Sequence, residues 1–225
     1  MRPRPFLLLI AGFTLALMTA GEADAKEPLW SYDTGVGGNV NSVAISADGE
    51  YIAAGTDGEC EAPEMACKVY LFDKNSSTPL WNYTADDPIL TVAISADGEY
   101  IVAGGEDDKV YLFNKDNSTP LWNYTTGGWV YSVAISAEGE YIVTGTSDGK
   151  VYLFDKDSST PLWSYSTGAR VYSDSVAISA DGEYIAVGSF DNKIYLFDKD
   201  GNPTNSSSTP LWSYSTGARV YSDSV

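Results

Sequence analysis

Short runs of apolar and polar residues alternate along this chain, separated by turn-forming residues. In the cleanest copy Val, Ile, Tyr and Phe dominate four runs, and these residue types favour pleated strands. The runs, named A to D in chain order, are SVAIS (Ser132–Ser136), EYIVTG (Glu140–Gly145), KVYLFD (Lys150–Asp155) and PLWSY (Pro161–Tyr165). Run C is apolar on both sides, so the sequence predicts a strand buried on both faces, as between stacked sheets.

The turns between these runs are equally regular. An acidic residue followed by glycine joins strand A to strand B in each copy, and such pairs supply the positive φ of tight hairpins. These pairs are Asp48-Gly49, Asp97-Gly98, Glu138-Gly139 and Asp181-Gly182. Turn chemistry at identical positions explains these acidic residues better than a calcium or catalytic site. No segment shows helical periodicity of useful length.

The four-strand unit repeats with a period near 40 residues. Its landmark tryptophans are Trp30, Trp81, Trp122, Trp163 and Trp212, spaced 51, 41, 41 and 49 residues apart. Such a period with short strands is typical of a β-propeller, so the predicted fold is all-β with four-stranded antiparallel blades. We expect a signal peptide at 1–25 and propeller repeats at 26–225, with blades near 28–78, 79–119, 120–160, 161–209 and a partial one at 210–225.

The chain ends suggest how the ring closes. Residues 208–225 repeat 159–176 letter for letter, and the chain stops within the next strand A. Leu29–Tyr32 has the sequence of a strand D, the usual device that completes a last blade. Four blades closed by that strand would leave Leu211–Tyr214 redundant. We therefore expect a fragment of a longer ring, of about six to eight blades.

The pattern SVAISADGEYIVAG…KVYLFDK resembles a WD-repeat blade, although the Gly-His and Trp-Asp dipeptides are absent. Strand C and its continuation also resemble the tryptophan-docking motif of quinoprotein-dehydrogenase-like propellers. That motif places an aspartate eight residues before a tryptophan, here Asp73/Trp81 and Asp155/Trp163, with Asn114/Trp122 a near match and Asp198/Trp212 stretched by an insertion. Ser-Thr-Pro replaces the usual Thr-Gly. The resemblance implies propeller architecture and leaves the activity open.

Composition narrows the function. Thirteen Lys and Arg against 31 Asp and Glu give a formal charge of −18, which disfavours binding to nucleic acid or anionic lipid. The chain has no histidine, which excludes histidine-based acid–base, triad and metal chemistry. We therefore expect no enzyme, cofactor or metal site. The alternatives are a quinoprotein-type dehydrogenase fragment, which would need a quinone pocket and a calcium site, and an envelope assembly factor that adds client strands at a blade edge.

The first 25 residues have the pattern of an export signal. Arg2 and Arg4 precede an apolar run, and Ala23-Asp24-Ala25 offers a small-x-small cleavage site. We expect a secreted or cell-envelope protein without membrane insertion after cleavage, the alternative being an uncleaved anchor. In an exported chain, Cys60 and Cys67 are expected to form a disulfide rather than a metal site. Possible N-glycosylation sites are Asn75, Asn82, Asn117, Asn123 and Asn205.

The copies differ mainly in the loops from strand D to strand A and from B to C. Both connections lie at one end of an up-and-down blade, so the variation collects on one face, where loops usually carry binding. Trp129 and Phe190 could serve there as stacking platforms, and drift in exposed turns is the alternative. We expect the ligand to be a protein or a cell-surface glycan. The candidate residues are Asp86, Asp87, Glu106, Asp107, Trp129, Tyr131, Arg170, Tyr172, Phe190 and Asp191.

Overall fold

The computed structural model describes residues 26–35, 38–58, 67–201 and 209–217. Within these ranges it contains sixteen β-strands and no helix, so the predicted all-β fold is confirmed. Blade 1 consists of β1 (Val40–Ile45), β2 (Tyr51–Thr56), β3 (Lys68–Asp73) and β4 (Trp81–Thr84). Blade 2 consists of β5 (Ile89–Ile94), β6 (Tyr100–Gly105), β7 (Lys109–Asn114) and β8 (Trp122–Thr125). Blade 3 consists of β9 (Val130–Ile135), β10 (Tyr141–Thr146), β11 (Lys150–Asp155) and β12 (Trp163–Ser166). Blade 4 consists of β13 (Val176–Ile178), β14 (Tyr184–Ser189), β15 (Lys193–Asp198) and β16 (Trp212–Ser215).

Each blade is an antiparallel sheet whose strands follow chain order from A to D. The predicted A–B hairpins form as expected, because Gly49, Gly98, Gly139 and Gly182 all have φ between 74° and 77°. In blade 1 the hydroxyl of Ser46 donates a hydrogen bond of 2.6 Å to Asp48. This bond and the Glu50 N–H lower the pKa of Asp48. The acidic turn residues therefore act on the turn itself.

A β-bulge interrupts the start of strand A in blades 1, 2 and 3. The register between strands A and B shifts between Val40 and Ser42 in blade 1, and at the equivalent positions in the next two blades. The bulge leaves one extra residue on strand A that has no direct partner on strand B. That residue is Asn41 in blade 1, Leu90 in blade 2 and Tyr131 in blade 3.

The hydrophobic core lies between the blades. Strand C supplies both sides of it: Val151 and Leu153 of β11 pack toward blade 4, whereas Tyr152 and Phe154 pack toward blade 2. All four side chains are buried, which confirms the prediction for this strand. In blades 1, 2 and 3 a tryptophan on strand D then reaches the following blade. The Trp81 ring lies 5.4 Å from that of Phe113, and its indole N–H donates a 2.7 Å hydrogen bond to the Lys115 carbonyl.

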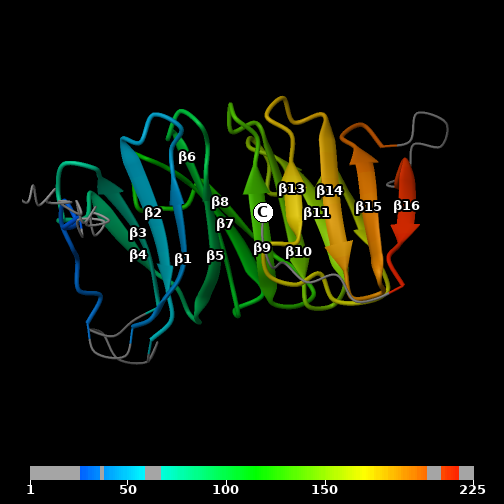
Figure 1. Cartoon of the computed structure of the whole chain (residues 1–225), viewed down its shortest axis with the longest axis horizontal. Helices are drawn as coiled ribbons and strands as arrows, with labels where there is room; N and C mark the ends of the chain where they lie inside the picture. The colour runs from blue at the N-terminus through cyan, green and yellow to red at the C-terminus, as the bar shows by residue number, and fades with distance from the viewer. Residues whose placement is uncertain (1–25, 36–37, 59–66, 202–208, 218–225) are drawn as a thin grey trace, which may run out of the picture.

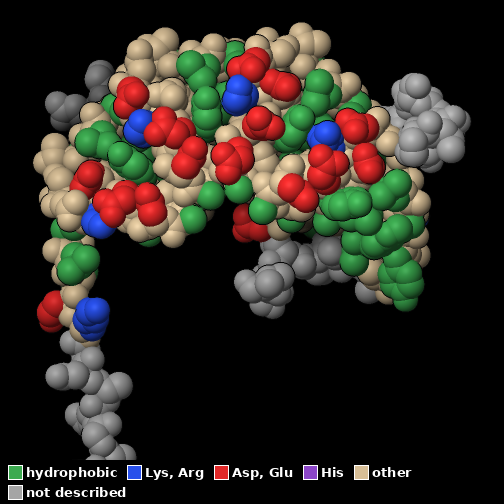
Figure 2. All heavy atoms as spheres, turned by 90° about the horizontal axis from the view of Figure 1, so that it is seen from above, with side chains coloured by type: hydrophobic (Ala, Val, Ile, Leu, Met, Phe, Trp, Pro, Cys, Tyr) green, Lys and Arg blue, Asp and Glu red, His purple; other side chains and the backbone are tan. Residues whose placement is uncertain are grey.

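The blades stack in sequence order from left to right in Figure 1. Backbone hydrogen bonds of 2.9–3.0 Å link the A–B turns of successive blades, from Ala47 through Ala96 and Ala137 to Ala180. The A strands contact one another in the order β1, β5, β9, β13. Viewed from above, the four blades form an open arc with one hollowed side (Figure 2). Four blades therefore do not close into a ring in this structure.

The prediction of a strand D near the start of the chain needs correction. Leu29–Tyr32 does not form a strand, since β15, the last strand C, is already paired with β16 and no other strand C lacks its partner. Trp30 nevertheless packs on Phe72 of blade 1, at a ring distance of 5.4 Å. The tryptophans of β4, β8 and β12 lie between blades and are partly buried, since strand D is the outer strand of each blade.

Several predicted features lie outside the described residues. These are the export signal at 1–25, the cysteine Cys60 and the glycosylation site at Asn205. Cys67 is described and is buried, and its pairing with Cys60 stays a prediction. No helix long and apolar enough to cross a membrane occurs in the described part of the chain.

Candidate functional site

The D–A loop and the B–C turn of each blade meet at one end of the sheet, the lower edge in Figure 1. In every blade an N–H of the B–C turn donates a backbone hydrogen bond to a carbonyl of the D–A loop. These bonds run from Asp57 to Asn39 (3.0 Å), Glu106 to Pro88 (2.9 Å), Ser147 to Trp129 (2.9 Å) and Phe190 to Arg170 (3.0 Å). The two most variable connections thus form one continuous surface, here called the loop face.

These hydrogen bonds align the loop face of the four blades residue by residue. Three positions project from it in each blade: the D–A residue that accepts the bond, the residue two places further along, and the B–C residue that donates the bond. The sets are Asn39, Asn41, Asp57; Pro88, Leu90, Glu106; Trp129, Tyr131, Ser147; and Arg170, Tyr172, Phe190. The character of the loop face therefore changes from polar in blade 1 to aromatic in blades 3 and 4.

The residue between the first two positions is aliphatic in every blade: Val40, Ile89, Val130 or Val171. Val40 is exposed at the end of the arc, whereas the other three are buried and pack against the strand-B glycine of the preceding blade. The scaffold is thus constant while the exposed positions on either side of it differ. A surface that varies on a fixed frame is the arrangement in which loops carry binding residues.

The aromatic residues of blades 3 and 4 form one row, here called the aromatic row: Trp129, Tyr131, Tyr172 and Phe190. Successive ring centroids lie 6.1, 5.0 and 5.3 Å apart. The Trp129–Tyr131 pair is edge-on and the Tyr172–Phe190 pair is stacked. Trp129 is 42% exposed and Tyr172 is 38% exposed. The chain therefore holds a row of partly exposed rings across a blade boundary.

Charged groups flank the aromatic row. Partial burial raises the pKa of the Tyr131 hydroxyl, while the nearby Arg170 opposes this shift and Glu106 of blade 2 adds to it. Burial also raises the pKa of Glu106, and the charges of Asp87 and Asp57 add to that shift. Arg170 and Glu106 thus lie close enough to the row to act on the Tyr131 hydroxyl, and Glu106 in turn lies near Asp87 and Asp57.

Other predicted candidates are engaged within the turns. The Tyr111 hydroxyl donates a hydrogen bond to Asp107, and Tyr195 donates one to Asp191 in the same way. Burial raises the pKa of Asp107 despite that bond. Lys109 forms an ion pair of 2.7 Å with Asp86. The structure therefore brings together seven of the ten candidates at the row: the four aromatic residues, Arg170, Glu106 and Asp87. The other three, Asp86, Asp107 and Asp191, are engaged in pairs of their own.

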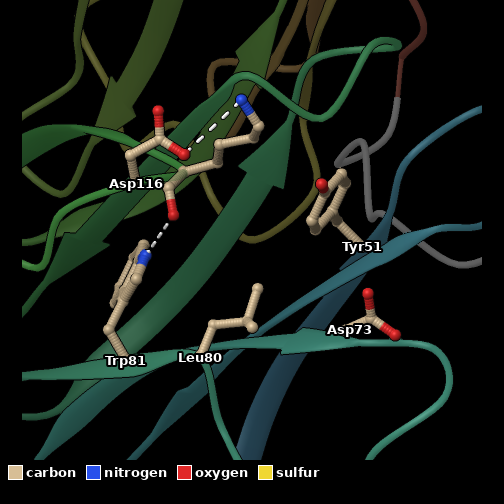
Figure 3. A pocket seen from close by; sticks show the side chains of 6 residues that line it. Tyr51, Asp73, Leu80, Trp81 and Asp116 are labelled. Atoms are coloured by element: carbon tan, nitrogen blue, oxygen red, sulfur yellow. Dashed lines mark hydrogen bonds and ion pairs between the residues drawn. The ribbon is translucent and has the colours of Figure 1, made fainter.

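Sequence reasoning did not single out the cavity of about 340 Å³ between blades 1 and 2. It is lined by Tyr51, Asp73, Leu80, Trp81, Lys115 and Asp116, which surround the docked tryptophan (Figure 3). The Trp81 N–H is bonded to the Lys115 carbonyl, and the Lys115 ammonium pairs with Glu99 at 2.6 Å and Asp116 at 3.6 Å. The main polar groups of this cavity are thus used to dock blade 1 on blade 2. The Asp73/Trp81 spacing in the sequence is the signal that could have located it.

A quinone cofactor held beside calcium does not fit the described residues. They contain no group of three or more His, Cys, Asp or Glu side chains placed to hold a metal ion. Three of the loop-face carboxylates, Asp107, Asp191 and Asp86, are engaged in separate pairs with Tyr111, Tyr195 and Lys109.

Comparisons with known proteins agree with the repeat architecture. A family model described as "Outer membrane protein assembly factor BamB", of the PQQ-like repeat type, matches residues 66–220. A model described as "WD domain, G-beta repeat" matches residues 26–60. No curated protein matches the sequence.

Solved structures show the same fold. A chain of the "Crystal Structure of Mitotic Checkpoint Complex" superposes with a TM-score of 0.67 at 17% sequence identity. The match covers 81% of this chain and 55% of that chain, so the protein spans about half the length of the solved propeller. Because the PQQ-like repeat model covers more than half of the sequence, the chain belongs to the repeat family described as outer membrane protein assembly factor BamB.

Proposed function

We propose that this protein is an exported, non-enzymatic β-propeller of the cell envelope that binds a segment of a partner protein on its loop face. The observation that carries the proposal is the aromatic row. Blade 1 presents only Asn39, Asn41 and Asp57 at the positions where blades 3 and 4 present four aromatic rings and an arginine. Partly exposed rings gathered across a blade boundary are a feature that folding of the blades does not require.

The chemistry of the row favours a protein ligand over a glycan. Aromatic residues and arginine are enriched at the energetic centres of protein interfaces. A sugar ring stacks on a free aromatic face, but Tyr172 stacks on Phe190 with an interplanar angle of 19°, and its ring lies 5.0 Å from that of Tyr131. The rings shield much of each other's faces, so they fit apolar side chains better.

The charge of this protein further restricts the kind of partner segment that it would bind. The chain carries a formal charge of −18, and Glu106 and Asp87 lie near each other at the blade 2 side of the row. Complementary charge speeds encounter and selects among partners. A segment that combines aromatic or aliphatic side chains with Lys or Arg matches both parts of this surface.

Two further observations support a place in the envelope. The first 25 residues have the pattern of an export signal. The matching family model is described as an outer membrane protein assembly factor, a role that requires contact with other proteins. The partner we propose is accordingly an envelope protein.

The proposal is tested by fluorescence polarisation with a labelled peptide in which Tyr and Lys alternate. We expect the peptide to bind the wild-type chain, and Trp129→Ala or Tyr172→Ala to weaken binding about tenfold or more. The matched control is Asn39→Ala, which removes the side chain at the position of Trp129 in blade 1 and should leave affinity unchanged.

Two results would contradict the proposal. One is equal affinity for all three variants and the wild type, which would place the contact elsewhere. The other is binding of a soluble envelope polysaccharide that depends on Trp129 when the peptide does not bind, which would make the ligand a glycan.

A further inference from the structure

The two ends of the arc expose faces that are buried at every internal blade boundary. At the blade 1 end, Val43 and Ile45 are 68% and 62% exposed. The equivalents of Val43 in the later blades, Val92, Val133 and Val176, are at most 8% exposed. We call this surface the acceptor end; it comprises Val43, Ile45, the partly buried Ile52, and Tyr70 and Phe72, which Trp30 and Tyr32 cover.

The blade 4 end carries the opposite half of the same contact. Trp212 is 51% exposed and Tyr214 is 65% exposed, whereas the same positions of β4, β8 and β12 are partly covered by the next blade. Leu196 is partly exposed, although Leu71, Leu112 and Leu153 at this position are fully buried. We call this surface the donor end; it comprises Tyr184, Leu196, Trp212 and Tyr214. Apolar side chains gather there at one end of the arc (Figure 2).

The two ends are complementary because the chain already contains their contact three times. Within the arc, the donor side of one blade packs on the acceptor side of the next through a Trp–Phe contact of 5.3–5.4 Å. Each contact includes a hydrogen bond of 2.7–2.8 Å from the indole N–H to a lysine carbonyl. Trp212 and Phe72 are the residues of the same two kinds that the arc leaves without each other.

Trp30 occupies the acceptor end from within the same chain. Its ring lies 5.4 Å from Phe72, and its N–H donates a 2.7 Å hydrogen bond to the Lys74 carbonyl. Tyr32 packs beside it, 5.2 Å from Phe72. This copies the inter-blade contact, yet no strand accompanies it, so Val43 and Ile45 stay exposed.

We propose that two copies of this chain associate head to tail, the donor end of one packing on the acceptor end of the other, with Trp30 as an intramolecular competitor. Phe72 and the Lys74 carbonyl accept one indole at a time. Trp212 of a second copy can therefore dock only when Trp30 leaves. The pairing joins different surfaces of the two copies, so it produces either a closed ring or an open series of copies.

Because Trp30 and Trp212 compete for one site, replacing each of them by alanine should change the association of two copies in opposite directions. Trp212→Ala removes the incoming ring, and we expect it to weaken association about tenfold or more. Trp30→Ala removes the competitor, and we expect it to strengthen association by a similar factor. A merely structural role of both tryptophans would shift association in the same direction.

The experiment is light scattering after size exclusion over about a hundredfold range of concentration. Moderate salt screens the repulsion between copies that each carry a formal charge of −18. Val43→Glu places a charge on the acceptor end, where the isolated chain exposes the side chain, and should block association. Ser213→Glu, on the opposite side of β16 from Trp212, is the matched control and should leave association unchanged. Circular dichroism confirms that each variant keeps its strands.

A discrete dimer and a series of larger species both support the proposal, provided that Val43→Glu returns them to monomers. A wild type and a Trp30→Ala variant that both remain monomeric at every concentration overturn it. So does association that Val43→Glu and Trp212→Ala leave intact. The peptide-binding experiment on the loop face is independent of these outcomes, because neither end of the arc contributes to the aromatic row.

Discussion

The indole N–H of Trp122 in blade 2 donates a 2.7 Å hydrogen bond to the main-chain oxygen of Lys156 in blade 3. Its ring packs at 5.4 Å on that of Phe154, which is fully buried. One side chain on a short outer strand therefore fixes the next blade by both packing and hydrogen bonding. The same relationship recurs at the other internal boundaries, from Trp81 to Lys115 and from Trp163 to Lys199.

Replacing Trp122 by alanine is expected to destabilise the protein by about 3 kcal/mol, through lost packing on Phe154 and a Lys156 carbonyl left without this donor. Urea unfolding followed by circular dichroism measures the change. Trp122→Phe keeps most of the ring and should cost only about 1 kcal/mol. A loss below about 0.5 kcal/mol for the alanine variant would show that the indole does not hold the blades together.

Gly104 of β6 admits no side chain, because a Cβ there would overlap the Val130 side chain of blade 3 and lie 2.8 Å from Val130 Cβ. We expect Gly104→Ala to cost about 1–3 kcal/mol by forcing blades 2 and 3 apart. Thermal unfolding checks the cost. The double variant Gly104→Ala, Val130→Ala should recover part of it, and additive losses would argue against this contact as the cause.

Burial raises the pKa of Tyr70 to about 12, and the neighbouring Tyr32 adds to the shift. The folded state therefore holds the phenolic proton more tightly than the unfolded chain, whose tyrosines ionise near pH 10. This contribution to stability is complete below pH 10 and is lost as the pH rises toward 12. Tyr70→Phe should flatten the alkaline decline in the free energy of unfolding, measured by urea unfolding at pH 9 to 11. An unchanged slope would contradict this assignment.

The Cys60–Cys67 disulfide stays a prediction from the sequence. Both cysteines lie in the insertion that only the first repeat carries. In protein secreted under oxidising conditions, intact mass after alkylation without reductant should show no modified thiol. Reduction should cost about 2–3 kcal/mol by the chain-entropy estimate for a short loop. Two alkylated thiols in unreduced protein would exclude the pairing.

Much of the fold could be predicted because the same turn and strand sequences recur in each of the four repeats. The Asp-Gly pairs mark the hairpins, and the doubly apolar KVYLFD marks the strand between blades. The strand expected at Leu29–Tyr32 was wrong, because a strand needs a hydrogen-bonding edge as well as the right residues. Sequence alone supplies the residues and cannot show that β15 already has β16 as its neighbour.

The candidate site was foreseen as a list of residues but not as an arrangement. Variation among the copies pointed to Trp129 and Phe190, yet the row depends on the D–A loop of blade 4 carrying Tyr172 against Tyr131. That loop is longer than the others, so its path does not follow from the repeat. The engagement of Asp107 and Asp191 could have been suspected, since a tyrosine follows each of them four residues later.

The bulge at the start of strand A separates what the loop face presents from what the blades need. Asn41, Leu90 and Tyr131 occupy the same bulged place, and the strands beyond it keep their register whichever residue stands there. An amide, an aliphatic chain and a phenol are thus interchangeable on one frame. A library of substitutions at this bulged position and at the two other loop-face positions can therefore be built blade by blade. Such a library would give new binding surfaces without redesign of the core.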